Sequence, residues 1–290
     1  MKGRFLDEFR RCLVGLSDLF FERDCAVCGG PLASGGQFVC RQCLDDMPLT
    51  YFWTYSENAA MERLFEADPG ESGNRPAYGC RIHNAAALFF YRHESPWCEI
   101  VRRFKYGRRE SLGLWASRML GDYLAGGGLY GDVQAVVPVP LHWFKRWKRG
   151  FNQAEIIARG VAERLGTGRA GDDNPAACDT AGRAAAASTS KETSSDDTSA
   201  TARALPVETR LLRRVRYTST QTRRGASSRR QNIRGAFAVN PKAVARLKAS
   251  GIRHILLVDD VMTTGATLSE CIRLLQRDFT VSVATLGFVE

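Results

Sequence analysis

The sequence predicts an α/β protein, in which a parallel β-sheet with helices on both faces is preceded by a small N-terminal module. Short aliphatic runs such as 255–258 alternate with segments whose apolar residues recur every three or four positions. This alternation is typical of parallel strands connected by helices. The module is predicted by the regular spacing of four cysteines between residues 25 and 43.

An amphipathic helix is expected at the start of the 290-residue chain. Its apolar positions recur at helical spacing and are Phe5, Leu6, Phe9, Leu13, Leu16, Leu19 and Phe20. Its polar face mixes acidic and basic residues, which favours packing against the protein over binding to a membrane surface. The first 22 residues lack the uninterrupted apolar run of a secretory signal, and no run is long enough to span a membrane. We therefore expect a cytoplasmic protein.

The cysteine module, assigned with this helix to residues 1–55, has the ligand spacing of a structural zinc ribbon. Two Cys-x-x-Cys pairs are separated by eleven residues, and nearby glycines permit the tight turns that bring thiolates onto one ion. The predicted zinc ligands are Cys25, Cys28, Cys40 and Cys43. Because all four positions are cysteine, no coordination site stays open for catalysis. The alternatives are two disulfides or unconnected thiols, which a reducing compartment disfavours.

Residues 56–83 are rich in turn-forming residues and are interpreted as a connector, and the main domain is assigned to residues 84–290. The elements expected in its first half are strands at 85–91 and 134–140 and helices at 96–106, 111–125 and 153–165. Asn152 is placed to cap the last of these helices. The segment 141–152 is interpreted as a loop in which aromatic and basic residues are interleaved.

Residues 166–206 differ in composition from everything around them. No Val, Ile, Leu, Phe, Tyr or Trp occurs between Leu165 and Leu205. Such a segment cannot bury enough apolar surface to offset the entropy of ordering it, so we expect a disordered insertion without chemistry. The elements expected after it are strands at 235–239, 255–258 and 281–289 and a helix at 268–278.

The most informative stretch follows the aliphatic run 255–258, where Asp259 and Asp260 precede a small, hydroxyl-rich turn and a helix. Ligands of parallel sheets lie beyond the carboxyl ends of the strands, and a helix amino terminus there offers N–H groups to a phosphate. Carboxylates accept hydrogen bonds from sugar hydroxyls or bind a hydrated divalent cation. The stretch therefore predicts a phosphosugar site. The alternative is a buried strand followed by a helix that Thr263 or Thr264 caps.

The same stretch closely resembles the PRPP-binding signature of type I phosphoribosyltransferases. The resemblance implies a type I phosphoribosyltransferase-like sheet, in which Asp259 and Asp260 contact the ribose hydroxyls. It also implies that a turn wraps the 5′-phosphate, and the residues of that turn are Thr263, Thr264, Gly265, Ala266 and Thr267. Mg²⁺ bridging the pyrophosphate and the ribose would supply charge.

Basic residues are concentrated in two stretches of the chain, the second of which contains the acidic pair. Residues 81–165 contain 14 basic and 7 acidic residues, and residues 207–290 contain 15 and 6. Stabilising a pyrophosphate leaving group requires such charge. One candidate is a pyrophosphate or nucleic-acid loop after the strand at 134–140, with Lys145, Arg146, Arg149 and Gly150. The other is a lid at 217–231, with Arg223, Arg224 and Arg230. The alternative for each is a solvated basic surface.

Taken together, the motifs resemble the ComF/GntX family across nearly the whole chain except 166–206. They are the cysteine module, Lys105-Tyr106, the run 137–141, Arg149-Gly150-Phe151-Asn152-Gln153, the segment 221–237 and the run 257–268. The chain departs from the family in its insertion and in having Asp24 where a proline often precedes the first cysteine. The resemblance implies a role in natural competence and the use of incoming DNA. It implies as partners PRPP or a related phosphosugar, single-stranded DNA and a competence helicase.

Two functions compete on this evidence, with a zinc-ribbon docking scaffold as a weaker third. The first is a phosphoribosyltransferase-like protein that binds PRPP with Mg²⁺; the sequence identifies neither its acceptor nor a general base. The second is a non-catalytic single-stranded nucleic-acid module, in which basic residues contact phosphates and aromatic residues stack on bases. The aromatic residues in question are Trp143, Phe144, Trp147 and Phe151. Burial in the core is the alternative for each of them.

Overall fold

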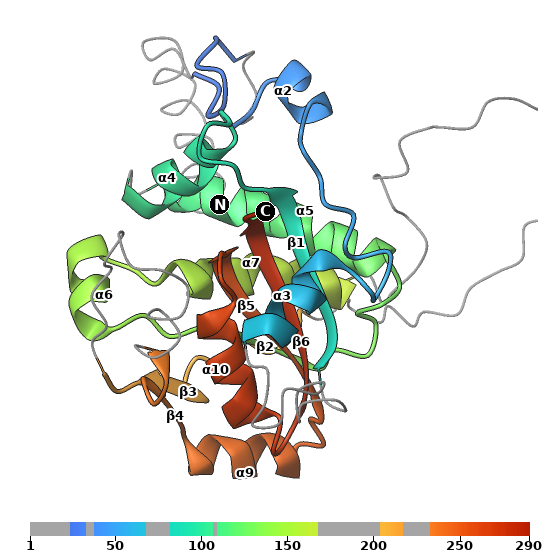
Figure 1. Ribbon diagram of the computed structural model, residues 1–290, viewed down its shortest axis with the longest axis vertical. Coiled ribbons are helices and arrows are strands. Elements are labelled where there is room, and N and C mark those ends of the chain that lie inside the picture. The colour runs from blue at the N-terminus through green and yellow to red at the C-terminus, as the bar shows by residue number, and fades with distance from the viewer. Residues whose placement is uncertain (1–23, 33–37, 68–81, 107–108, 168–203, 217–232) are drawn as a thin grey trace, which may run out of the picture.

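The computed structural model describes residues 24–32, 38–67, 82–106, 109–167, 204–216 and 233–290. At its centre is a parallel sheet with the strand order β1–β6–β5–β2 (Figure 1). Its strands are β1 (Ile82–Phe90), β2 (Ala135–Pro138), β5 (His254–Met262) and β6 (Thr280–Phe288). The predicted parallel α/β fold is confirmed.

Strand β5 lies in the middle of the sheet because its aliphatic residues have strands on both sides. Leu257 is in register with Val137 of β2 and with Val283 of β6. The four residues 255–258 are fully buried, as are their neighbours on β2 and β6. The strand continues beyond this run to Met262, so the acidic pair belongs to the strand itself.

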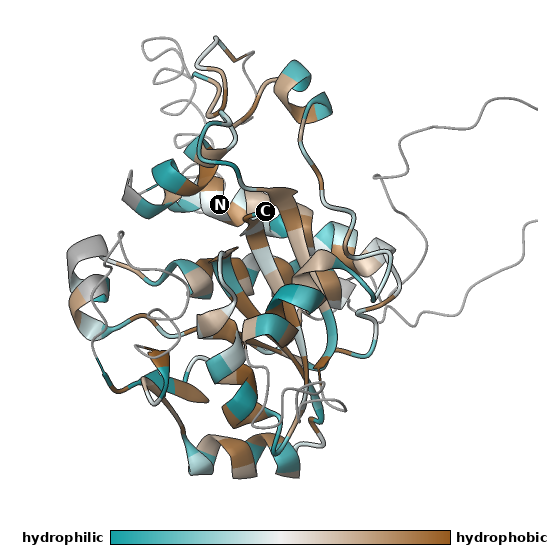
Figure 2. Ribbon diagram, in the orientation of Figure 1, coloured by the Kyte–Doolittle hydropathy of each residue, from teal (hydrophilic) through white to brown (hydrophobic). Residues whose placement is uncertain are grey.

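Helices cover both faces of the sheet. Helices α3 (Ala59–Ala67) and α10 (Ala266–Leu275) lie side by side on one face, and α5 (Glu110–Gly126) and α7 (Gln153–Thr167) pack together on the other (Figure 1). The remaining helices are α2 (Arg41–Asp45), α4 (Cys98–Tyr106), α6 (Trp143–Arg149) and α9 (Pro241–Ala249). Figure 2 shows the strands of the central sheet largely hydrophobic, whereas α3, α9 and α10 each carry both hydrophilic and hydrophobic residues. This pattern is expected of helices that bury one side.

Several elements differ from the sequence prediction. Residues 59–67, within the stretch interpreted as a connector, form helix α3. Part of the segment 141–152, interpreted as a loop, forms helix α6, which Gly150 ends in a left-handed conformation (φ 87°). The strand expected at 235–239 is β4 (Phe237–Val239), which pairs antiparallel with β3 (Leu212–Arg214) outside the central sheet. Short-range patterns identified the strand but do not encode its partner.

Some predicted segments lie outside the described residues, namely the N-terminal helix, the whole of the lid at 217–231, and residues 168–203 of the insertion. The two ends of the insertion are described. Its first residues complete α7, and Leu205 donates its N–H to the carbonyl of Ala162, 3.0 Å away. Among the helices that the structure describes, none combines the length and the apolar character needed to cross a bilayer.

Candidate functional site

The acidic pair lies at the carboxyl edge of the central sheet, where the sequence places it. The N–H of Asp260 donates to Oδ1 of Asp259 at 2.8 Å, which orients the Asp259 carboxylate. Successive side chains of a strand point to opposite faces. Asp260 accordingly contacts Lys105 at the end of α4, with 3.0 Å between Nζ and Oδ2. Asp259 is within electrostatic range of Cys271 on α10 and Arg214 on β3.

The surroundings of Asp259 favour its neutral form. Burial raises the pKa of this carboxyl group, and the charge of Asp260 raises it further. The Asp260 N–H, Lys105 and Arg214 act in the opposite direction but do not compensate. A cation, or hydrogen-bond donors from a ligand, would stabilise the ionised form of such a carboxyl group.

Lys105 belongs to a motif shared with the ComF/GntX family, and among the contacts described it is the cation nearest to the acidic pair. Its side chain is 21% exposed and that of Asp260 is 17% exposed, so this ion pair is shielded from most of the solvent. Helix α4 brings the lysine to the site from far away in the sequence. No spacing rule could have found this contact.

The turn between β5 and α10 has the features of an anion cradle. Gly265 is the N-cap of α10, with φ 71°, and no side chain caps the helix. The alternative in which Thr263 or Thr264 caps α10 is therefore wrong. Ala266 and Thr267 form the first turn of the helix, so their amide groups stand where the helix dipole favours negative charge.

Helix α3 packs against this turn, a contact that the sequence did not indicate. Arg63 donates to the carbonyl of Thr263, and also to that of Val289 at 2.9 Å. A Cβ atom at Gly265 would come within 3.1 Å of the Arg63 carbonyl oxygen. Ser269 of α10 donates its hydroxyl to the carbonyl of Leu64 at 3.2 Å. The turn is thus held between two helices and the last strand.

The predicted pyrophosphate or nucleic-acid loop follows β2, the parallel neighbour of β5, and Val139 at its start donates its N–H to the carbonyl of Val258 at 2.9 Å, so the loop begins at the same edge of the sheet as the acidic pair. On α6, Arg146 forms an ion pair with Glu155 of α7, with 3.1 Å between Nη1 and Oε1. Lys145 and Arg149 lie on the same helix, but their side chains are outside the described set, as are all three lid arginines, Arg223, Arg224 and Arg230. The flanks of the lid, β3 and β4, are described and bring Arg214 close to Asp259.

The aromatic residues of this region divide into two groups. Trp143, Phe144 and Trp147 of α6 are exposed, at 70%, 42% and 78%. Phe151 instead packs against Phe104, with 5.8 Å between the ring centroids. The first three therefore form an exposed aromatic surface, which we call the α6 surface, and the core interpretation holds only for Phe151.

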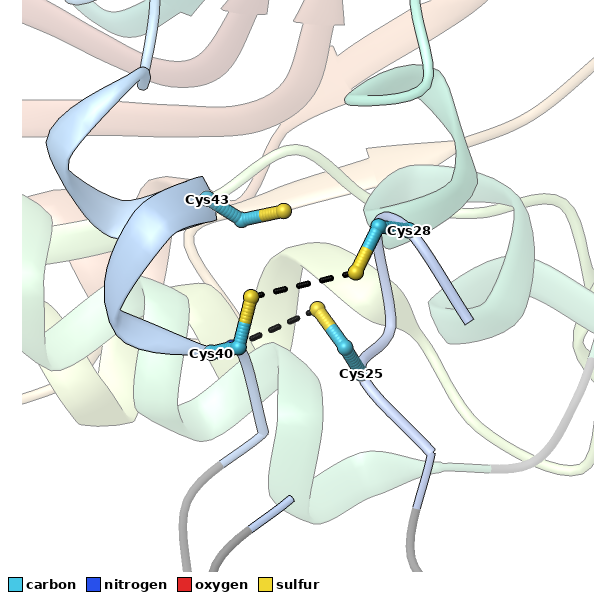
Figure 3. A group of neighbouring side chains, drawn as sticks. All are labelled: Cys25, Cys28, Cys40 and Cys43. Carbon is cyan, nitrogen blue, oxygen red and sulfur yellow. Dashed lines mark hydrogen bonds between the residues drawn. The ribbon is translucent and has the colours of Figure 1, made fainter. Parts of the chain in front are cut away.

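The four cysteines of the N-terminal module converge as predicted. Their side chains point toward one another (Figure 3), and the four sulfurs lie within 4.8 Å of one another. The Sγ atoms of Cys28 and Cys40 are 3.8 Å apart, which is about the edge of a tetrahedron with Zn–S bonds of about 2.3 Å.

Backbone groups favour the thiolate form of Cys25, whereas burial and the neighbouring cysteines raise the pKa of Cys43. Burial opposes ionisation of Cys25, but backbone N–H donors, first that of Cys40 at 3.3 Å, lower its pKa to about 6. The donor set and its spacing fit a structural zinc ion. The module packs on the main domain through Phe38 and Trp115 of α5, whose ring centroids are 6.1 Å apart.

Comparison with known proteins identifies curated relatives, while no protein-family model matches the chain. The chain is 28% identical over 187 residues to Competence protein F of Haemophilus influenzae, a match that covers 63% of this chain and 62% of the relative. It is 25% identical over 191 residues to DNA utilization protein YhgH of Salmonella typhimurium and of Escherichia coli K12, covering 65% of this chain and 64% of each relative. The match spans slightly less than two thirds of these relatives. They support the resemblance to the ComF family.

Proposed function

We propose that this protein binds PRPP or a related phosphosugar at the carboxyl edge of β5. One observation carries the proposal: the acidic pair and the amino terminus of α10, which no side chain caps, are joined by a single turn held in place by α3. Sugar hydroxyls satisfy Asp259 and Asp260, and the 5′-phosphate satisfies the amide groups of the turn, Thr263 to Thr267.

Mg²⁺ is the cation that suits this site, because carboxylate and phosphate oxygens are its preferred ligands. Asp259 and Asp260 would hold it, and it would neutralise the charge of a pyrophosphate group. Asp260 already has Lys105 as its partner at 3.0 Å. The cation is therefore expected to arrive with the diphosphate, which contributes further oxygen ligands.

The biological setting that we propose is the uptake or use of DNA. Its support is the names of the relatives, Competence protein F and DNA utilization protein YhgH. A competence helicase and a cytoplasmic location belong to the same proposal.

Calorimetric titration with PRPP in the presence of Mg²⁺ tests the binding site. The wild-type chain is expected to bind, and Asp259→Asn combined with Asp260→Asn is expected to abolish binding. Asp132→Asn is the matched control, because Asp132 contacts His254 at the opposite end of β5 (2.9 Å) and does not touch the turn. Absence of heat from the wild type at millimolar PRPP contradicts the proposal.

A second candidate function, single-stranded nucleic-acid binding, is favoured by the α6 surface. Exposed tryptophans provide platforms on which bases stack, and the same helix carries Lys145, Arg146, Lys148 and Arg149. A strand of DNA could contact this surface while its phosphates meet the basic residues.

Fluorescence anisotropy with a labelled oligothymidine at several salt concentrations tests this candidate. Binding is expected to weaken steeply with salt and to depend on Arg146 and Arg149, because neutralised phosphates release counterions. Binding that ignores salt, or no binding at low salt, excludes it.

We also propose that the cysteine module holds one structural zinc ion. Metal analysis of the purified chain is expected to find about one zinc per molecule. Cys25→Ser or Cys40→Ser is expected to lose it, whereas Cys98→Ser, a change outside the cluster, is expected to retain it. A zinc-free wild type that is fully folded contradicts the assignment.

A further inference from the structure

We infer that Arg63 is the positioning residue of the phosphate-binding turn, an inference that rests on the proposed phosphosugar site. Arg63 belongs to α3, 200 residues before Thr263 of the turn, and nothing in the sequence pattern connects the two. Through its hydrogen bond to the turn, its guanidinium group orients a peptide group of the proposed phosphate site.

The contacts of Arg63 join three elements. Its Nη1 donates to the carbonyls of Thr263, in the turn, and of Val289, just after β6. Its guanidinium carbon lies 4.9 Å from the ring centroid of Phe288, within the range of a cation–π interaction. The side chain is half-buried; its bond to Val289 is partly shielded from water, whereas its bond to Thr263 is exposed to solvent.

Peptide geometry converts the bond at Thr263 into an orientation of the turn. In a trans peptide, the carbonyl and the N–H of the same unit point in opposite directions. Because the Thr263 carbonyl points to the Arg63 guanidinium group, the N–H of Thr264 points away from that group. Arg63 thus fixes the direction of one donor of the cradle, the N–H of Thr264, to which the proposed phosphate would bind.

The neighbouring glycine shows that this arrangement is close-packed. Gly265 has φ 71°, and a Cβ atom there would meet the Arg63 carbonyl oxygen at 3.1 Å and the Ala67 Cβ at 3.4 Å. Backbone and side chain of Arg63 therefore both constrain the turn. Loss of the guanidinium removes the polar restraint and leaves the backbone contact in place.

Three variants test this role. Arg63→Met removes the guanidinium but keeps an unbranched apolar stem, and Arg63→Lys keeps the charge and a donor. Arg92→Met is the matched control, because Arg92 also anchors the chain's end, through Glu290, but makes no described bond to the turn. Binding of ribose 5-phosphate, PRPP and inorganic pyrophosphate is measured by calorimetry, and the amide signal of Thr264 by NMR.

Arg63→Met is expected to weaken ribose 5-phosphate and PRPP by the same factor, about tenfold or more, and to leave pyrophosphate unchanged. Arg63→Lys is expected to recover part of the loss, and Arg92→Met to behave as wild type. The Thr264 amide signal is expected to shift in Arg63→Met without any ligand. An equal loss for pyrophosphate would mean a general structural defect and overturns the inference.

The two proposals fail in different ways. If the wild type binds ribose 5-phosphate and Arg63→Met binds it equally well, the positioning role is wrong and the phosphosugar site stands. If the wild type binds no phosphosugar while the Thr264 signal still moves in Arg63→Met, the phosphosugar site is wrong and the positioning of the turn stands.

Discussion

The segments that follow β5 and β2 start from neighbouring strands at the same edge of the sheet, yet they are built differently. After β5, the chain makes a turn held by Arg63 and by the close approach of α3 at Gly265. After β2, it forms the short helix α6, whose Trp143 and Trp147 are largely exposed. The first segment is a rigid, partly buried cradle, and the second is an open surface.

This difference separates two kinds of ligand. A small phosphosugar needs donors held in place beforehand, because a loose turn would have to be ordered at the cost of binding energy. A flexible polymer strand instead gains from an open platform whose aromatic rings stack on bases and whose basic residues meet phosphates. The segment after β5 thus suits the small ligand of the first candidate function, and the segment after β2 suits the nucleic acid of the second.

The largest expected effect that distinguishes the two segments is the pH dependence caused by Asp259. Its pKa is raised to about 7, first by burial and then by Asp260. The folded chain therefore holds this proton more strongly than the unfolded chain. Protonated Asp259 stabilises the fold fully below the ordinary aspartate pKa, and this contribution to the unfolding free energy is lost as the pH rises through the raised pKa of Asp259.

Relative to Asp259→Asn, the wild type is expected to lose about 2 to 4 kcal/mol of unfolding free energy between about pH 4 and pH 8. Urea denaturation across this range without added magnesium measures it. Parallel curves for the two proteins would show that burial and Asp260 do not raise the pKa of Asp259.

Next in size is a paired glycine substitution, since Gly265 and Gly150 share the left-handed conformation but have different surroundings. Gly265→Ala must crowd the Arg63 carbonyl, whereas a Cβ atom at Gly150 meets nothing within 4 Å. We expect losses of about 2 to 3 kcal/mol for Gly265→Ala and about 1 kcal/mol for Gly150→Ala, the conformational cost alone. Thermal denaturation compares them, with ribose 5-phosphate binding lost in the first variant only. Equal losses would contradict a rigid cradle.

A smaller effect is expected from removing one basic residue from each region, Lys105 beside the acidic pair and Arg146 on α6. Lys105→Met leaves the shielded Asp260 carboxylate without its ammonium partner, so we expect a loss of about 1 to 2 kcal/mol. Arg146→Met breaks the pair with Glu155, in which the arginine is 58% exposed, so the expected loss is below about 0.5 kcal/mol. Urea denaturation resolves this difference in unfolding free energy. A larger loss for Arg146→Met than for Lys105→Met would mean that the ion pair on α6 is the better shielded of the two.

The smallest effect on stability is expected from Trp147→Ala, because this side chain is 78% exposed. The unfolding free energy should change by less than about 0.5 kcal/mol, whereas affinity for oligothymidine should fall by about 1 kcal/mol or more through the loss of one stacking face. Ribose 5-phosphate binding should not change. If phosphosugar binding falls instead, the two segments form one site and the contrast between them is wrong.

Much of the framework was readable from local patterns. The aliphatic run 255–258 predicts a buried strand because a short, uninterrupted series of aliphatic residues suits a strand covered by helices on both faces of the sheet. Asn152 was identified as a helix cap, and its Oδ1 accepts the N–H of Ala154 at 3.3 Å. The cysteine pairs predicted a converging cluster because each pair closes through a short turn. These features depend on residues close together in the chain.

The misses have a common cause. The sequence predicts a connector at helix α3 because turn-forming residues follow it closely, although its apolar side packs against α10 and β1. Helix α6 was taken for a loop because its exposed aromatic residues hide the usual pattern of one apolar and one polar side. In both cases tertiary position outweighs local composition.

The sequence alone determined the strand, the acidic pair, the small residues of the turn and the four cysteines, because each depends on spacing within a few residues. Only the tertiary structure decided that Lys105 reaches Asp260, that Arg63 holds the turn and that three aromatic residues of α6 are exposed. Contacts between residues far apart in the chain depend on how helices pack on the sheet, and a linear pattern of residue types does not contain that packing.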